Sequence, residues 1–92
     1  MLKAEFSGQF RRDYKLALKR NCDPAALQAV LALLLEERTL PPKYRDHVLV
    51  NTRNYKEMRE RHIEPDWLLI YKVYPESGVL KLVRTGSHSD LF

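Results

Sequence analysis

The sequence predicts an α+β domain in which a pair of helices packs on a mostly antiparallel sheet. Three observations support this class. A short alternating segment comes first, two helical segments follow it, and the second half contains three segments typical of strands. Because 92 residues provide one hydrophobic core, we expect residues 1–92 to form a single domain.

The composition excludes several classes of protein. Hydrophobic residues make up 45% of the chain and charged residues 30%, as in ordinary globular domains. No apolar run approaches the ~18 residues of a membrane span, and the first residues lack the core of a signal peptide. The single cysteine, Cys22, excludes an internal disulfide and a cysteine-based zinc site. We therefore expect a cytoplasmic protein without a membrane partner, and its net charge of +4 fits an anionic partner such as nucleic acid.

The first part of the chain predicts a strand and a helix. Residues 2–6 alternate between apolar and charged side chains, which is typical of a short, half-buried strand. Ser7 is placed to cap a helix that starts near Gly8. The apolar face of this helix is expected to consist of Phe10, Tyr14, Ala17 and Leu18.

A second helix follows after a short break at residues 21–24. Asp23 is its expected N-cap and Pro24 its first residue. Because the break is short, the two helices are expected to form an antiparallel hairpin, with the second helix the more deeply buried. Its apolar stripe consists of Leu27, Val30, Leu31 and Leu34, widened by Leu33 and Leu35. The pair Pro41–Pro42 prevents its continuation.

The second half of the chain predicts three strands after a polar loop at 43–54. Residues 55–63 are highly charged, which favours an edge strand. Residues 67–74 are nearly continuous in apolar and aromatic side chains, as in a central strand. The turn-forming residues 75–78 then connect to a returning strand at 79–85.

Three histidines lie at junctions between these elements. His47 follows the helices, His62 is near the end of the charged strand, and His88 follows the last strand. A short hairpin would bring His62 close to Asp66. Histidine accepts and returns protons near neutral pH, so these residues suit acid–base catalysis. Scattered surface histidines are the simpler alternative, and metal binding is disfavoured because no element carries two histidines at ligand spacing.

Acid–base groups with cations nearby are suited to RNA cleavage. RNA supplies its own nucleophile, the 2′-OH, so a base, an acid and positive charge suffice without a metal. Basic and aromatic residues alternate at 43–45 and 53–56, and Arg84 adds charge. Two alternatives remain open. The charged strand can be a solvated face in which Glu57 and Glu60 pair with arginines, and Trp67 can belong to the core.

Three segments resemble the YafQ-like toxins, a branch of the RelE/ParE superfamily of bacterial toxin–antitoxin modules. They are residues 44–47, residues 62–71 and residues 84–92. The last two contain H-x-x-P-D-[WL]-x-L-x-Y and R-x-G-[ST]-H-x-x-L-F, which are specific in combination. The resemblance runs nearly end to end. It departs at 48–55, where this chain lacks the Pro and the Gly that members usually carry after the histidine equivalent to His47.

The resemblance implies a RelE-like α+β fold and a type II toxin that cuts mRNA in the ribosomal A site. It implies no metal or other cofactor, and an antitoxin that neutralises the toxin. In the roles that we assign, His88 is the general acid, His47 or Asp66 takes the 2′-OH proton, and His62 orients Asp66 or steadies the phosphate. The expected catalytic residues are His47, His62, Asp66 and His88, and the expected RNA-binding residues are Arg84, Trp67 and Phe92.

Two other functions fit the same fold class. A ParE-like toxin would bind DNA gyrase rather than cut RNA, and a stand-alone RNA-binding module would have no chemistry. The three histidines with Asp66 favour the nuclease over the gyrase inhibitor. The modest net charge argues against a pure binding module, which usually has a stronger basic bias.

Overall fold

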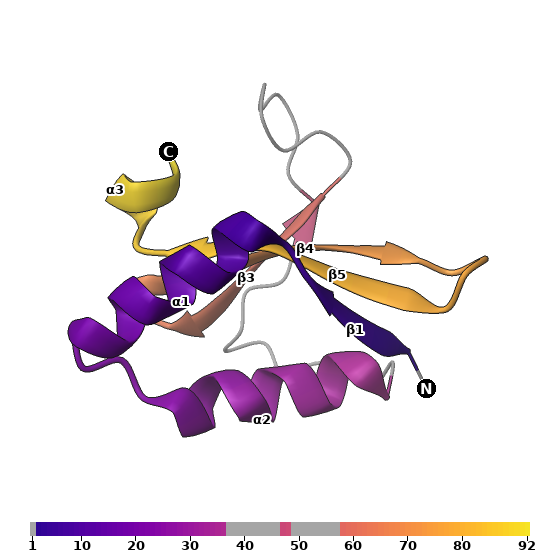
Figure 1. Cartoon of the computed structure of the whole chain (residues 1–92), viewed down its shortest axis with the longest axis horizontal. Coiled ribbons are helices and arrows are strands. Elements are labelled where there is room, and N and C mark those ends of the chain that lie inside the picture. Colours follow the sequence, from indigo (N-terminus) through magenta and orange to yellow (C-terminus); the bar gives the residue numbers. More distant parts are fainter. Residues whose placement is uncertain (1, 37–46, 49–57) are drawn as a thin grey trace.

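The computed structural model describes residues 2–36, 47–48 and 58–92. The polar loop expected at 43–54, apart from His47–Val48, and the first residues of the strand expected at 55–63 lie outside these ranges. The elements, in chain order, are β1 (Lys3–Phe6), α1 (Gly8–Lys19), α2 (Pro24–Leu35), β2 (His47–Val48), β3 (Arg59–Glu64), β4 (Trp67–Tyr74), β5 (Val79–Gly86) and α3 (His88–Leu91). α2 runs antiparallel to α1, and α3 follows the end of β5 (Figure 1).

The strands form one mixed sheet in the order β1-β5-β4-β3-β2. β3, β4 and β5 are antiparallel, which confirms the predicted α+β fold with its three-stranded unit. β1 pairs parallel to β5, with Lys3 opposite Val79. The prediction that the charged strand lies at an edge was wrong, because β2 pairs with β3 over Arg59 and Glu60.

α1 begins as predicted and differs in the composition of its buried face. The Ser7 hydroxyl accepts the Phe10 N–H at 2.9 Å and donates to the Val83 carbonyl at 2.7 Å, which ties the helix start to β5. Leu18, expected on the buried face, is 40% exposed. The buried side chains are Phe10, Asp13 and Ala17. The buried face of α1 therefore runs along the line from Phe10 to Ala17, and Leu18 lies at the margin of this face.

Local hydrogen bonds make the turn between the two helices. Asn21 adopts a left-handed conformation with φ of 63°. The Asn21 N–H bonds to the Leu18 carbonyl and the Cys22 N–H to the Ala17 carbonyl, both at 3.1 Å. This is a Schellman motif, which ends α1. α2 then starts as predicted, with the Asp23 side chain accepting the Ala25 N–H at 2.9 Å.

The core fills both faces of the sheet because β4 alternates between them. Trp67, Leu69 and Tyr71 belong to the cluster that includes the buried residues of α1 and α2. Leu68 and Ile70 pack instead with Leu91 of α3. β4 is therefore a central strand, as its continuous apolar sequence predicted. In α2, Leu27, Val30 and Leu34 are buried, whereas the leucines that widen the stripe are only partly covered.

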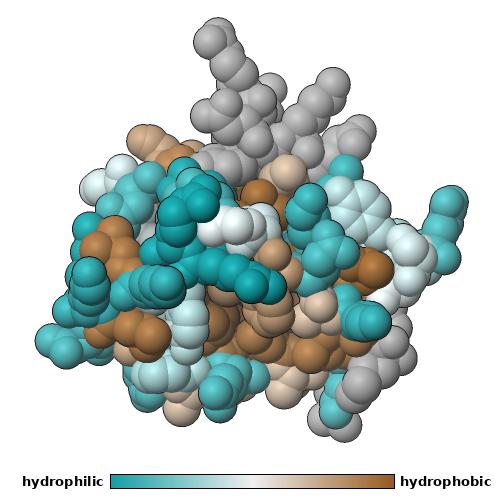
Figure 2. Space-filling model, in the orientation of Figure 1, coloured by the Kyte–Doolittle hydropathy of each residue, from teal (hydrophilic) through white to brown (hydrophobic). Residues whose placement is uncertain are grey.

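Apolar side chains remain at the surface between α1 and α2. In Figure 2, hydrophilic atoms cover much of the outer face of α1, and hydrophobic atoms show between the helices. Phe6, Phe10, Tyr14, Leu27 and Leu31 line a groove of about 570 Å³ there. No helix in the described part of the chain is long and apolar enough to span a membrane.

Candidate functional site

The turn after β5 presents His88. Ser87 caps α3, its hydroxyl accepting the Asp90 N–H at 3.2 Å while Asp90 Oδ2 accepts the Ser87 N–H at 2.9 Å. This reciprocal capping box closes the single turn of α3. A Cβ at Gly86 would lie 3.0 Å from the Cβ of Asp90, so the glycine of this motif leaves room for the capping carboxylate. His88 is the exposed first residue of α3.

Three of the residues predicted from the sequence meet at this turn. The rings of His88 and Phe92 are 4.9 Å apart, and Phe92 is 48% exposed. Asp66, in the turn between β3 and β4, accepts the His88 N–H at 3.5 Å through Oδ1. Because the antiparallel pairing of β4 and β5 brings their ends together, residues 22 positions apart form one exposed cluster of an imidazole, a carboxylate and an aromatic ring.

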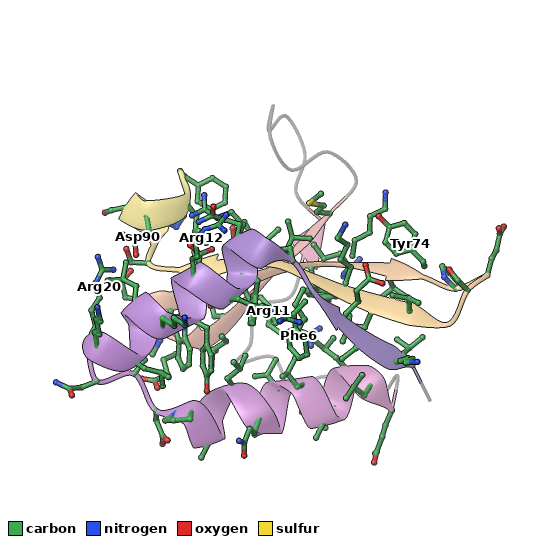
Figure 3. The ribbon with its side chains drawn as sticks, in the orientation of Figure 1. Phe6, Arg11, Arg12, Arg20, Tyr74 and Asp90 are labelled. Atoms are coloured by element: carbon green, nitrogen blue, oxygen red, sulfur yellow. The ribbon has the colours of Figure 1, made fainter. Side chains whose placement is uncertain are left out.

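Sequence reasoning missed an ion pair that connects this turn to α1. Nη1 of Arg20, the C-cap of α1, lies 2.5 Å from Oδ2 of Asp90 (Figure 3). The hydrogen bond from Arg20, followed by that from the Ser87 N–H, lowers the pKa of Asp90 to about 2. The same contact raises the pKa of Arg20. The residues are 70 positions apart, so local patterns contain no signal for this pair.

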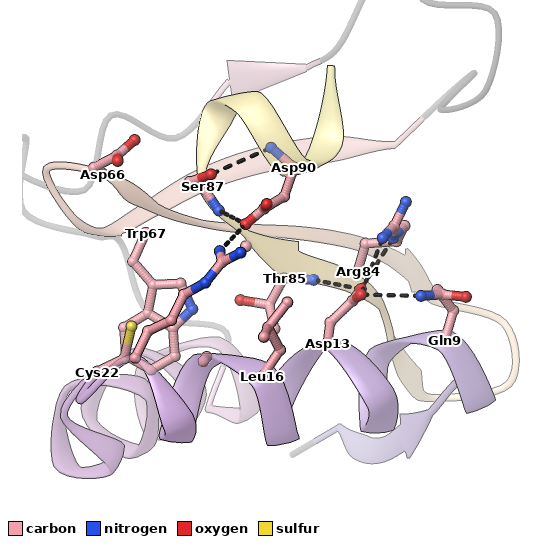
Figure 4. A pocket seen from close by; sticks show the side chains of 13 residues that line it. Gln9, Asp13, Leu16, Cys22, Asp66, Trp67, Arg84, Thr85, Ser87 and Asp90 are labelled. Carbon is pink, nitrogen blue, oxygen red and sulfur yellow. Dashed lines mark hydrogen bonds and ion pairs between the residues drawn. The ribbon is translucent and has the colours of Figure 1, made fainter.

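Arg84 has a partner that the sequence analysis also missed. Its Nε and Nη2 each donate to one oxygen of Asp13 at 2.9 Å (Figure 4). Gln9 and the Thr85 N–H also donate to this carboxylate. Burial raises the pKa of Asp13, but the hydrogen bonds from Arg84, Gln9 and Thr85 outweigh it and leave the pKa below its usual value. The available signal was the position of this acid on the apolar face of α1.

A groove of about 550 Å³ lies between α1 and the segment from Arg84 to Asp90 (Figure 4). Trp67 and Cys22 are among its lining residues. Trp67 is 3% exposed and belongs to the core. No RNA contact is shown for it, and its role in RNA binding stays a prediction. Its Nε1 has no hydrogen-bond partner among the described residues. Burial, with the nearby charge of Glu64, raises the pKa of the Cys22 thiol.

His62 and Asp66 have different polar neighbours. In the ladder His62 is opposite Leu68, and an irregularity between His62 and Glu64 precedes the turn. The Nε2 atom of His62 is 3.5 Å from Oε1 of Glu60, and within the described ranges no hydrogen bond joins His62 to Asp66. The expected proximity of His62 and Asp66 stays a prediction, and the hydrogen bond that the structure shows for Asp66 comes from the His88 N–H.

His47 enters the sheet through its backbone. It forms β2 with Val48 and pairs with Glu60 of β3, the strand that also carries His62. The basic and aromatic segments expected at 43–45 and 53–56 lie outside the described residues. Within residues 2–36, 47–48 and 58–92, no group of three or more His, Cys, Asp or Glu side chains is arranged to hold a metal ion.

Known proteins share this architecture along the whole chain. The model of the family described as bacterial toxin of type II toxin–antitoxin system, YafQ, matches residues 2–92. The mRNA interferase toxin YafQ of Escherichia coli strain K12 is 43% identical over 89 residues, which cover 96% of this chain and 92% of that protein. The crystal structure of a metal-bound toxin from Helicobacter pylori is 42% identical and has a TM-score of 0.90 over all of both chains. The crystal structure of the E. coli DinJ–YafQ complex is 42% identical and has a TM-score of 0.86, covering 100% of this chain and 99% of the other.

The fold and the similar solved structures together define a small α+β bacterial toxin. The chain belongs to the YafQ family of toxins from type II toxin–antitoxin systems. The family resemblance read from its sequence motifs is thereby confirmed.

Proposed function

We propose that this toxin is an endoribonuclease that cuts mRNA in the ribosomal A site. The observation that supports this most directly is the cluster of Asp66, His88 and Phe92 at one exposed end of β4 and β5. It combines a group that can exchange protons at neutral pH with an aromatic face for an unpaired base. Relatives that are 43–44% identical are mRNA interferases, which supports the same activity here.

The proposed reaction is an attack of the 2′-OH on the adjacent phosphate. A base removes the 2′-OH proton, and His88 donates a proton to the departing 5′-oxygen. The products are a 2′,3′-cyclic phosphate or a 3′-phosphate, and a 5′-hydroxyl. The proposed base is the exposed carboxylate of Asp66, which lies beside the backbone of His88, and His47 is the alternative base. Each positioned acid or base of this kind typically contributes ~10²–10⁴-fold to the rate.

The other site residues have supporting roles in this proposal. His62, next to Glu60, steadies the phosphate from β3. Phe92, half exposed, provides a surface on which a base stacks. Arg84 contributes positive potential from a position set by Asp13, and Trp67 supports the groove beside it.

The partners in this proposal are the ribosome, mRNA and an antitoxin. An E. coli relative has been crystallised in the DinJ–YafQ complex, which supports an antitoxin for this chain. The net charge of +4 suits both rRNA phosphates and an acidic antitoxin segment. We place the toxin in the bacterial cytoplasm and assign residues 1–92 to one toxin domain.

Cleavage on programmed ribosomes tests the proposal. The purified toxin is added to ribosomes that hold a defined codon in the A site, and RNA 5′ ends are mapped. We expect new RNA ends with a 5′-hydroxyl. The His88→Ala variant should produce none of them, and it should unfold at the same midpoint as the wild type. If the purified wild-type toxin produces no new ends on these ribosomes, the proposal is wrong. Inhibition of gyrase supercoiling by the same protein would favour the gyrase-directed alternative.

A further inference from the structure

α3 carries His88 but is too short to be stable alone. It has four residues, His88–Leu91, whereas isolated helices below ~12 residues are marginal in water. Its position therefore depends on contacts with the rest of the molecule. Leu91 fixes one side of α3 by packing against Leu68 and Ile70. The carboxylate of Asp90 holds another side.

One oxygen of Asp90 makes two different contacts. Oδ2 accepts the Ser87 N–H at 2.9 Å, which closes the turn locally. The same oxygen lies 2.5 Å from Nη1 of Arg20, which joins the turn to α1. Figure 3 shows the Arg20 and Asp90 side chains directed toward each other across the gap between the two helices. The position of the His88 turn relative to α1 therefore depends on this contact.

The end of α1 directs Arg20 toward the turn. The Schellman motif with Asn21 and Cys22 fixes the helix end, so the Arg20 side chain starts from a defined position. Asp13 and Arg20 are seven residues apart on α1, about two helical turns, and lie on the same side. α1 thus holds the segment from Arg84 to Asp90 at both ends, through Asp13 and through Arg20.

We propose that Arg20 is a positioning residue that acts through Asp90 to hold the turn carrying His88 and Phe92. This inference rests on the proposed ribonuclease function. Arg20 and Asp90 side chains are 49% and 26% exposed, so their ion pair contributes little to global stability. Its effect is local, because displacing a reacting group by about 1 Å can lower a rate by about 10²-fold.

Activity of Arg20→Ala gives the first test. We expect single-turnover cleavage on programmed ribosomes to fall at least tenfold. Ribosome affinity should fall less than the cleavage rate does, because Phe92 moves with the turn, and the unfolding midpoint should fall only slightly. Lys19→Ala is the matched control, since it removes a neighbouring positive charge for which the described part of the chain shows no ion pair. If Arg20→Ala weakens ribosome binding and leaves the cleavage step unchanged, Arg20 binds RNA directly and the proposal is wrong.

A double-mutant cycle separates the route through Asp90 from other effects. Arg20→Ala and Asp90→Asn should each lower the cleavage rate. The double variant should be no slower than the slower single variant, because both substitutions break the same contact between Arg20 and Asp90. Independent, multiplying effects of the two substitutions would show that Arg20 does not act through Asp90.

NMR of the free toxin tests positioning without any assay of activity. We expect Arg20→Ala to shift the imidazole signals of His88 and to increase the mobility of residues 88–92, while His62 signals stay in place. Unchanged His88 signals overturn the positioning role, whatever the activity. If wild-type toxin cuts no mRNA on ribosomes, the proposed function fails, and the NMR result still decides whether Arg20 holds this turn.

Discussion

Arg84 and Asp13 face each other through two parallel hydrogen bonds, each 2.9 Å long. The pair joins the strand that leads to His88 with the helix that covers the sheet. Asp13 is buried, and the Thr85 N–H also donates to it at 3.3 Å. Planar, two-point contact of this kind restricts orientation as well as distance. Asp13 therefore fixes the orientation of the last residues of β5 relative to α1.

Replacing Asp13 should destabilise the fold. In Asp13→Asn the partly buried guanidinium of Arg84 loses its charged partner, and we expect a loss of about 2 kcal/mol in the free energy of unfolding. Urea denaturation followed by circular dichroism measures this change. Glu5→Gln is the control, since Glu5 is an exposed carboxylate on β1 and should shift the midpoint little. Equal shifts in the two variants would contradict the structural role of Asp13.

Stability should decrease in acid through the same carboxylates. The pKa of Asp90 is about 2 in the folded protein, against its usual value of 3.8, and the pKa of Asp13 is also lowered. A lowered folded-state pKa stabilises the protein above the unfolded-state pKa, and this stabilisation is lost as pH falls through the folded value. The contribution of Asp90 is thus lost between about pH 4 and pH 2.

Asp90→Asn should make the acid-dependent loss less steep. The free energy of unfolding, measured in urea at several pH values, should decrease less in this variant between about pH 4 and pH 2. Near neutral pH the variant should be slightly less stable than the wild type, because the capping box is weakened. Identical slopes in the two proteins would show that Asp90 titrates at its usual pKa.

A methyl group at Gly86 should impair the site. The added Cβ would lie 3.0 Å from the Cβ and 3.1 Å from Oδ2 of Asp90, so the capping carboxylate must move. We expect Gly86→Ala to reduce cleavage at least tenfold, since the turn that carries His88 is displaced. Gly8→Ala is the matched control, because its Cβ would meet only Arg12 at 3.7 Å. If Gly86→Ala cleaves RNA at the wild-type rate, the turn accommodates the methyl group without displacing His88.

Phe92→Ala should weaken RNA engagement and leave the fold intact. Stacking of a base on an aromatic side chain contributes ~1–3 kcal/mol, so we expect binding to programmed ribosomes to weaken about tenfold. Tyr74→Ala is the control. Tyr74 is 38% exposed at the end of β4 remote from α3 (Figure 3), and its loss should leave binding unchanged. Similar losses in both variants would argue against a specific role for Phe92.

Local patterns predicted most of the elements. Ser7, Asp23 and Pro24 marked the helix starts, and the apolar run at 67–74 marked the central strand. The burial of β3 was not predicted, because its charges indicated a solvated edge. Arg61 is 1% exposed, and its Nη2 donates to the Tyr71 hydroxyl at 2.8 Å. The partner that makes this burial tolerable lies on the next strand, beyond the reach of local patterns.

The candidate site was predicted only in part for the same reason. Motifs pointed to Asp66, His88 and Phe92, which the structure brings together. Arg20 and Asp13 were missed because each acts on a residue at least 70 positions away. The sequence also did not indicate that Asp66 accepts the His88 N–H or that His62 lies beside Glu60.

The parallel pairing of β1 with β5 has a consequence for folding. β1 has no strand partner until Val79–Leu82 are available, and Ser7 reaches Val83 across 76 positions of sequence. Contacts of such large sequence separation form late, since a long loop must close before they stabilise anything. The strand that precedes the His88 turn is also the strand that completes the sheet. Assembly of the candidate site is therefore coupled to the slowest part of folding, and the partly folded chain lacks the arrangement that we propose cuts RNA.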